Sequence, residues 1–587
     1  MPVIYKVPPI VLPLKAPEVG EQGYQGFHPR SEVLAKGWTS PDSQRPLPCP
    51  ILVEHDVAIP TRDGTKLYCD VYRPPDSADG TKVPALLNWS PFGKKFNGIR
   101  SLELMTPWNL GIPPDRLSGL EKFEGVDPAD WVPRGYAVLH VDTRGAFDSQ
   151  GVMCILGTQE AEDGYDAIEW VARQPWCSGS VGLAGNSHLA IAQWFIAAQQ
   201  PPSLKAIAPW EGCGDLYREQ FARGGIYGGG LFDKLIIPYM LRGRRGIESF
   251  RAMFDNHPFA NEWWNDKRPD LKRIRIPTYI TGTWTNTMHG MGAIRGWLEI
   301  DTPHKWLRWH GTQEWYDLWG NPNSQTELEL FFDRYLKDED NGWEATPRVR
   351  MAALRFGLQD PIENIVVQDF PIPNTDYRSL YLTSDGRLSS EAPSESSVLR
   401  YNSETKDTVS FTLRFAKETR LIGMAKAVLY MACPDADDWD VFVFVEKLDA
   451  QGQPMINLNL PWAAVPIRSF AEIKAEEKSE VVLYQGPTGM LRASLREIDT
   501  DKSIHPNWPF YPQSRSQKIP LGTVVRLEIG IWAFGVQYDA GESLRVHVGG
   551  QQLSVTNFGV QEHVQNRGTH EVYVGGKTAS FVSLPFV

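Results

Sequence analysis

The feature of this 587-residue sequence best suited to chemistry is Ser187, at the tip of a predicted turn between a strand and a helix. Val181–Ala184 has the apolar and small residues of a buried strand, and Leu189–Gln199 is rich in the alanine, isoleucine and leucine of a packed helix. A strained turn of this kind, with Gly185 before it, holds a serine hydroxyl exposed above a sheet as a nucleophile. Leu189 stands where a second glycine is usual, so a serine that only caps the helix is the alternative interpretation.

A serine hydroxyl becomes a good nucleophile when a histidine accepts its proton and an acceptor orients that histidine. In a sheet of this order the histidine is expected in the loop after the last strand, where Lys305–Trp309 is followed by His310. We therefore predict His310 as the base, and a histidine satisfied within its own loop is the alternative. His289 is a further candidate for the base or for a substrate contact, and Trp284 and Phe92 are candidate substrate contacts.

The acid of such a site is expected after the preceding strand, where Ile276–Thr283 is followed by Asn286. An amide can hold the tautomer of a histidine but cannot stabilise the imidazolium by charge. Glu211, which follows an earlier strand, is the best substitute acid, with a glutamate that anchors a lid as the alternative. The backbone N–H of His188 is the expected first donor to an oxyanion, and a second is expected from the loop after Trp89.

The strands and helices that must position these residues divide the chain into three predicted parts. Strands alternate with helices over residues 51–347, which predicts an α/β fold with a doubly wound parallel sheet and an antiparallel start. Within it, residues 212–272 are too many for a plain crossover and are interpreted as a helical lid. Residues 348–587 alternate like short strands and predict an all-β jelly-roll sandwich, whereas the proline-rich residues 1–50 predict an extended arm.

Composition narrows the class of partner. The chain is 42% hydrophobic with a net charge of −12, and its lysines and arginines form no basic stripe, which argues against nucleic acid. No apolar run is long enough to cross a membrane and no secretory signal is recognisable, so we expect a cytoplasmic protein that does not bind membranes. Six scattered cysteines indicate reduced thiols and no zinc site. The many aromatic residues suggest an apolar pocket for a small molecule. The sequence does not decide whether the protein is a monomer or a homo-oligomer.

Several motifs together resemble the cocaine-esterase-like branch of the X-Pro dipeptidyl-peptidase family of α/β-hydrolases. They are Asp142-Thr143-Arg144-Gly145, Gln174-Pro175-Trp176-Cys177, the serine turn itself, Gly386-Arg387-Leu388 and Leu491-Arg492-Ala493-Ser494. The resemblance implies an α/β-hydrolase sheet followed by a jelly roll. It also implies acyl hydrolysis by a serine, aspartate and histidine triad that uses no metal or cofactor, with Ser187 as the nucleophile.

The sequence departs from that family at three positions. Asn286 occupies the acid position, Glu314 lies near the histidine position so that His310 is a shifted match, and Phe92 replaces a tyrosine that donates to the oxyanion. We therefore expect a serine-dependent acyl hydrolase that cleaves esters of hydrophobic small molecules, in preference to amides, through an acyl-enzyme. Non-hydrolytic chemistry on a biosynthetic intermediate (acyl transfer, cyclisation or lyase) is the main alternative, and an inactive binding protein is the third.

Overall fold

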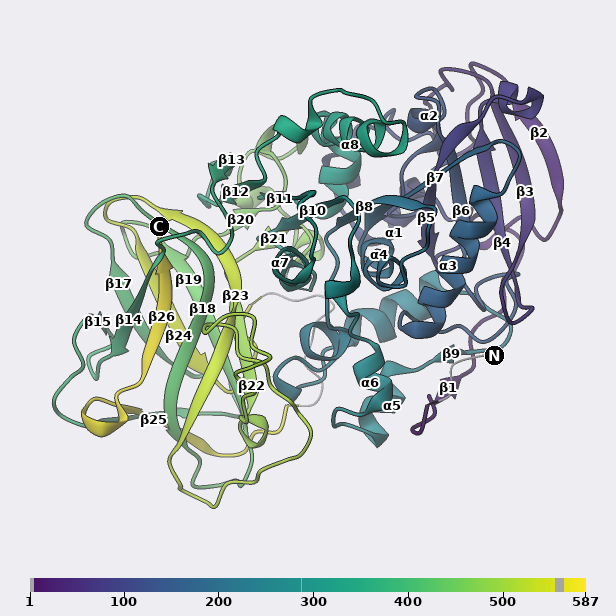
Figure 1. Ribbon diagram of the computed structural model, residues 1–587. Coiled ribbons are helices and arrows are strands. Elements are labelled where there is room, and N and C mark those ends of the chain that lie inside the picture. Colours follow the sequence, from purple (N-terminus) through teal and green to yellow (C-terminus); the bar gives the residue numbers. More distant parts are fainter. Residues whose placement is uncertain (1–4, 287, 555–563) are drawn as a thin grey trace.

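A computed structural model describes residues 5–286, 288–554 and 564–587 and places the chain in two halves, each built on a large sheet (Figure 1). The first sheet has eleven strands in the order β13-β12-β11-β10-β8-β7-β5-β6-β4-β3-β2. Their bounds are β2 Arg30–Leu34, β3 Ile51–Pro60, β4 Lys66–Arg73, β5 Val83–Ser90, β6 Ala137–Asp142, β7 Cys177–Asn186, β8 Leu204–Trp210, β10 Thr278–Thr283, β11 Lys305–His310, β12 Val349–Ala353 and β13 Ile362–Val367.

The centre of this sheet is parallel and both ends are antiparallel. Strands β6, β5, β7, β8, β10, β11 and β12 pair in parallel, whereas β2, β3 and β4 at one end and β13 at the other pair antiparallel. Every residue of β5, β6 and β10 is buried, as expected for strands that are covered on both faces. The carboxyl ends of the central strands therefore meet at one edge, which is where ligands bind in such sheets.

Helices cover both faces of the first sheet (Figure 1). On one face, α3 packs against α4 and both contact β7, while α7 contacts β10. On the other face, α8 contacts β7 and β8, and its Phe332 packs edge-on against Trp131 of α2. The bounds are α1 Gly98–Met105, α2 Pro128–Trp131, α3 Thr158–Ala172, α4 His188–Ala198, α5 Phe250–Asn256, α6 Glu262–Asp266, α7 Gly290–Glu299 and α8 Pro322–Leu336.

Between β8 and β10 the chain inserts a mostly helical segment in the place where a lid is predicted. It contains α5, α6, the helical turns Leu216–Phe221 and Phe232–Met240, and strand β9 (Ile247–Glu248). Aromatic side chains form its core, and the rings of Phe221 and Phe250 stack at 3.9 Å. Strand β9 pairs with β1 (Val11–Leu12), so the N-terminal segment is tied to this insertion.

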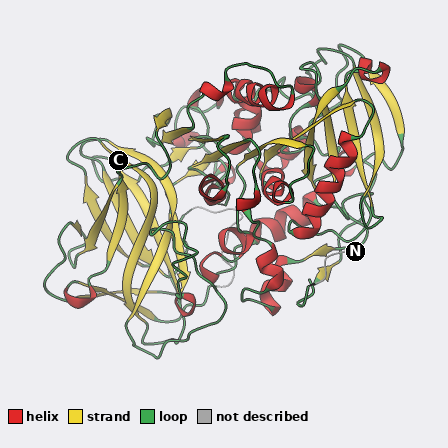
Figure 2. Ribbon diagram, in the orientation of Figure 1, coloured by secondary structure: helices red, strands yellow, loops and turns green. Residues whose placement is uncertain are grey.

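The second half is all β, as predicted, and every strand pair in its main sheet is antiparallel (Figure 2). The arrangement is consistent with a β-sandwich. The bounds of its strands are β14 Asp376–Leu382, β15 Leu388–Ser389, β16 Ser397–Asn402, β17 Thr408–Arg414, β18 Thr419–Ala432, β19 Asp440–Leu448, β22 Thr488–Arg492, β23 Val525–Tyr538, β24 Ser543–Gly549, β25 Thr569–Val574 and β26 Phe581–Phe586, with the short pair β20 Asn457–Leu458 and β21 Leu483–Tyr484 beside it.

The pairing of the strands shows to which sheet the segments near the predicted domain limits belong. Strand β12 pairs with β11 and β13 pairs with β12, so these strands, which follow the predicted limit at residue 348, belong to the first sheet. The next sheet begins at β14, beyond Val367. Within the predicted arm, residues 30–34 form β2 and extend the first sheet. No helix in the described part of the chain is long and apolar enough to cross a membrane.

Candidate active site

Ser187 lies at a strained turn between β7 and α4. Its backbone has φ 52° and ψ −119°, a left-handed conformation that few side chains adopt without strong constraint. A side chain at Gly185 would come within 2.6 Å of Leu189 Cδ2, so the glycine before the serine makes room for the leucine that replaces the usual second glycine. The turn is held on both sides, because Ser187 N–H donates to the Glu211 carbonyl (3.1 Å) and Asn186 N–H donates to the Glu124 carbonyl (3.0 Å).

Ser187 opens into a cavity at the carboxyl ends of the central strands. The first sheet and its loops supply most of the wall, the insertion supplies an apolar side, and the second half of the chain supplies three residues. The lining residues are Phe92, Met105, Phe123, Glu124, Ile155, Leu156, Ser187, His188, Ile191, Leu216, Gln220, Phe221, Leu231, Phe232, Ile236, Thr283, Thr285, Asn286, Met288, His289, Gln313, Glu314, Trp315, Asn459, Glu480 and Val481.

A histidine and a glutamate from neighbouring loops share this cavity with Ser187. His289 precedes α7, and its Nδ1 lies 3.0 Å from Glu314 Oε2 in the loop after β11. Only 3% of His289 and 4% of Glu314 is exposed. Asn286 shapes the first loop, because its side-chain oxygen accepts the backbone N–H groups of Met288 (2.8 Å) and His289 (3.1 Å). Since Nδ1 of His289 faces the Glu314 carboxylate and, also at 3.0 Å, the side-chain nitrogen of Asn286, Nε2 is the nitrogen that remains for a hydroxyl in the cavity.

A second histidine and glutamate, His310 and Glu211, pair outside the cavity. His310 Nε2 lies 2.7 Å from Glu211 Oε1 and 3.5 Å from Asp317 Oδ2, while Nδ1 lies 3.1 Å from Thr312 Oγ1. Burial lowers the pKa of His310 to about 4, and burial together with the charges of Glu314 and Asp317 raises the pKa of Glu211 well above its ordinary value. Among the described residues, neither member of this pair lines the cavity that holds Ser187.

The remaining predicted site residues also divide into those that line the cavity and one that does not. Phe92 lines the cavity and packs edge-on against Phe123 and the His188 ring, with centroids 5.3 and 5.9 Å apart. The His188 side chain turns away to Glu160, at 2.9 Å, which leaves its backbone N–H beside Ser187 at the start of α4. Trp284 instead stacks on Trp309 at 4.0 Å and is fully buried in the core, apart from the residues that line the cavity.

Sequence reasoning missed Glu124. This residue lines the cavity, and the Trp315 indole N–H donates to its Oε1 at 3.2 Å. Burial and the charge of Glu314 raise the pKa of Glu124 well above its ordinary value. Hydrogen bonds from Trp315, the Ser187 side chain and the His188 N–H lower the pKa, but by less. The residue lies in the irregular segment between β5 and β6, where no periodic pattern marks any side chain as functional.

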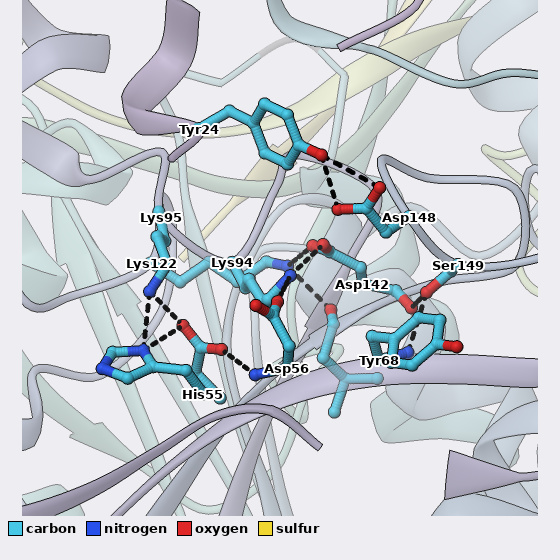
Figure 3. A network of polar contacts seen from close by, with 12 residues as sticks. Tyr24, His55, Asp56, Tyr68, Lys94, Lys95, Lys122, Asp142, Asp148 and Ser149 are labelled. Atoms are coloured by element: carbon cyan, nitrogen blue, oxygen red, sulfur yellow. Dashed lines mark hydrogen bonds and ion pairs between the residues drawn. The ribbon is translucent and has the colours of Figure 1, made fainter. Parts of the chain in front are cut away.

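A buried ionic network supports the two loops that carry Phe92 and Glu124 (Figure 3). Lys94 contacts Asp56 at 2.9 Å and Asp142 at 3.3 Å. Lys122 donates to the Val141 carbonyl at 2.7 Å and also approaches Asp142 at 3.4 Å; burial lowers the pKa of Lys122 to about 8. Lys94 is two residues beyond Phe92, and Lys122 is two residues before Glu124, so the contacts of both lysines with Asp142 tie the two loops to the end of β6.

Two family models match the chain. One is X-Pro dipeptidyl-peptidase (S15 family), over residues 63–234, and the other is the X-Pro dipeptidyl-peptidase C-terminal non-catalytic domain, over residues 341–583. The first match includes the serine turn, and the second covers the all-β half.

Known proteins agree with these matches. A crystal structure of a CocE/NonD family hydrolase from Staphylococcus aureus is 30% identical, covers 97% of this chain and 99% of its own, and superposes with a TM-score of 0.85. A cocaine esterase from Rhodococcus is 27% identical over 57% of this chain and 63% of its own length. An Xaa-Pro dipeptidyl-peptidase from Lactobacillus helveticus is 27% identical over 25% of this chain and 24% of its own length.

Proposed function

Because the chain belongs to the CocE/NonD family of hydrolases, we propose that it is a serine-dependent acyl hydrolase that cleaves esters of hydrophobic small molecules. The observation that carries the proposal is the presence in one cavity of a strained serine and a histidine paired with a carboxylate, namely Ser187, His289 and Glu314. A nucleophile, a base and an orienting acid are the three groups that acyl transfer to a serine requires.

In this assignment the roles of two loops are exchanged relative to the family pattern. The loop after β10 carries Asn286 at the family's acid position and supplies the base, His289. The loop after β11 supplies the acid, Glu314, near the family's histidine position. Both loops leave the same edge of the sheet, since Thr283 and His310 are register partners at the ends of these two parallel strands. The two loops are therefore adjacent, and the base and the acid can form the same pair when each stands on the other's loop.

The proposed reaction proceeds in two steps. Ser187 Oγ attacks the ester carbonyl as His289 Nε2 accepts its proton, with the imidazolium stabilised by Glu314 through Nδ1. The C–O bond to the alcohol breaks, and the alcohol leaves with the proton from His289, so that the acyl group stays on Ser187. Water then attacks the acyl-enzyme, gives a proton to His289, and releases the carboxylic acid as Ser187 regains its hydrogen.

The cavity wall supports an apolar substrate. Phenylalanine, leucine and isoleucine side chains from the insertion and from the loops before α1 and α3 surround the serine. The carbonyl of an ester is also the better match to this site, because an alcohol leaves more readily than an amine and Phe92 lacks the hydroxyl that the family pattern places there. The proposed substrate class is thus a carboxylic ester with an apolar acyl or alcohol group.

Labelling with a fluorophosphonate tests this function. We expect one covalent adduct on Ser187 of the full chain, located by peptide mass spectrometry, together with hydrolysis of a short aryl ester. Ser187→Ala should abolish both signals and keep the thermal melting curve. Ester turnover that survives Ser187→Ala, or an unlabelled Ser187 in an enzyme without esterase activity, would contradict the proposal and favour the non-hydrolytic chemistry that the sequence leaves open.

A further inference from the structure

The carboxyl group of Glu124 is a second functional group beside the serine. It lines the same cavity as Ser187 and His188, and its Oε1 accepts the Trp315 indole N–H at 3.2 Å. Its Oε2 is fully buried and no hydrogen bond of ordinary geometry from the described residues satisfies it, although the Ser187 side chain and the His188 N–H lie close enough to act on the carboxyl group. An unpaired buried polar atom destabilises the folded protein unless a ligand satisfies it. A residue of the cavity wall therefore has a carboxyl oxygen that the protein itself leaves without a well-formed hydrogen bond.

The backbone holds this carboxyl in place. Glu124 has a φ of 65°, an uncommon value for a residue with a side chain, and its carbonyl accepts the Asn186 N–H of the serine turn at 3.0 Å. Two residues earlier, Lys122 is buried and donates to the carbonyls of Val141 and Ser90, at 2.7 and 3.0 Å. The segment is fixed at both points, so the Glu124 carboxyl is preorganised next to the serine.

The protonation state of Glu124 determines what it can do. Burial and the Glu314 charge raise its pKa well above the ordinary value, which favours the neutral form. A neutral carboxylic acid has an O–H to donate, whereas a carboxylate accepts only. Protonated carboxylic acids that donate to an oxyanion are an established solution in other enzymes.

The site also lacks a donor at the place where the family pattern provides one. Phe92 lines the cavity but has no hydroxyl, and the turn supplies the backbone N–H of His188 beside Ser187. Oxyanions of acyl transfer are normally stabilised by at least two donors, and loss of one costs about 10²–10³ in rate.

We propose that the Glu124 carboxyl donates a hydrogen bond to the oxyanion and so replaces the hydroxyl that Phe92 lacks. The inference rests on the proposed function, because it concerns the same acyl-transfer step. When the carbonyl oxygen of a substrate enters, it takes the N–H of His188, and Glu124 turns its O–H toward that oxygen. No covalent bond to Glu124 forms, and the proton stays on the carboxyl group throughout.

Steady-state kinetics on a short aryl ester test this role. We expect Glu124→Ala to lower kcat by about 10²–10³. Glu124→Gln, whose amide N–H can still donate, should stay within about tenfold of the wild type. The matched control is Glu121→Gln, in the same segment, because Glu121 is also buried but accepts the N–H groups of Gly98 and Gly119 outside the cavity. It should leave kcat unchanged, and melting curves check that each variant folds.

The pH profile separates donation from a structural role. In the wild type, kcat should fall as the pH rises through the pKa of Glu124, because the carboxylate cannot donate and repels the oxyanion. Glu124→Gln should lose this alkaline decline and keep the acidic decline, where a protonated imidazole cannot act as a base. A structural role would leave the alkaline decline in place.

The outcomes distinguish this inference from the proposed function. If the wild type shows no turnover that depends on Ser187, both are overturned. If turnover depends on Ser187 but Glu124→Ala retains kcat within about threefold or gains activity, only the role of Glu124 is overturned. Equal losses in Glu124→Ala and Glu124→Gln would also overturn it, because donation would then not explain the effect.

Discussion

Two histidine–glutamate pairs lie at the same edge of the sheet, yet their surroundings differ. His310 and Glu211 are closer together, at 2.7 Å, than His289 and Glu314, at 3.0 Å. Only the second pair lines the cavity with Ser187. A short distance between imidazole and carboxylate is therefore no guide to which pair is catalytic. Access to the nucleophile, which depends on the direction of the side chain at the strand end, is the criterion that separates them.

The pairs also differ in electrostatics. Glu211 and His310 are both held toward their neutral forms by burial, which raises the pKa of the acid and lowers that of the base. Such a pair adds a polar contact to the core without a net charge. Its more direct link to the site is through the backbone, since the Glu211 carbonyl accepts the Ser187 N–H. We infer that the first pair supports the turn and that the second performs the chemistry.

The largest expected difference between the pairs is the effect of removing each histidine. Removal of the base costs about six orders of magnitude in kcat in a well-studied serine protease, so His289→Ala should be almost inactive on an aryl ester. His310→Gln should retain kcat within about tenfold if it is properly folded. The measurement is kcat on purified variants with matching circular dichroism. A loss in His310→Gln as large as that in His289→Ala would reverse the assignment.

The next largest difference concerns the acids. Replacing the triad acid by its amide costs about 10⁴ in kcat when the geometry is retained, so Glu314→Gln should fall by that order. Glu211→Gln provides the matched control and should lose less than about tenfold. Both variants can be assayed with the same ester beside the wild type. Equal losses would indicate that both carboxylates act on one histidine.

The neutral pair should be visible in the stability of the protein. The pKa of His310 is about 4 in the folded state and near 6.5 when unfolded, so between these values the unfolded chain binds more protons and stability falls as the pH decreases. One such group contributes a slope of up to about 1.4 kcal/mol per pH unit. His310→Gln should therefore show a shallower loss of unfolding free energy from pH 6.5 to 4 in urea titrations. Parallel curves for the two proteins would show that His310 titrates normally.

The smallest expected effect is that of adding the family's hydroxyl. Phe92 lies against Phe123 and His188 at the cavity wall. If Glu124 already donates to the oxyanion, Phe92→Tyr should change kcat by less than about threefold, because a second donor is present. In a Glu124→Ala background the same change should restore part of the lost rate. A large gain in Phe92→Tyr alone would mean that the site of the wild type lacks a donor.

Much of this arrangement follows from the sequence, but the proposal of His289 as the base does not. The small and apolar residues around Ser187 predict the strand, turn and helix, and the structure forms all three. His310 is the last residue of β11, so the pleat directs its side chain, whereas His289 lies in a loop six residues beyond β10. Position along the chain does not reveal that difference. Glu124 could not be found, because its loop has no periodicity and its proposed role depends on contacts with distant segments.

The second half of the chain contributes Asn459, Glu480 and Val481 to the wall around the nucleophile. A region with no part in bond making thus shapes the space that a substrate must fill. An exchange of only the all-β half between relatives would leave Ser187, His289 and Glu314 untouched and still change the shape of the cavity. The fit of a ligand can therefore be altered from a part of the chain that carries none of the residues proposed for the chemistry.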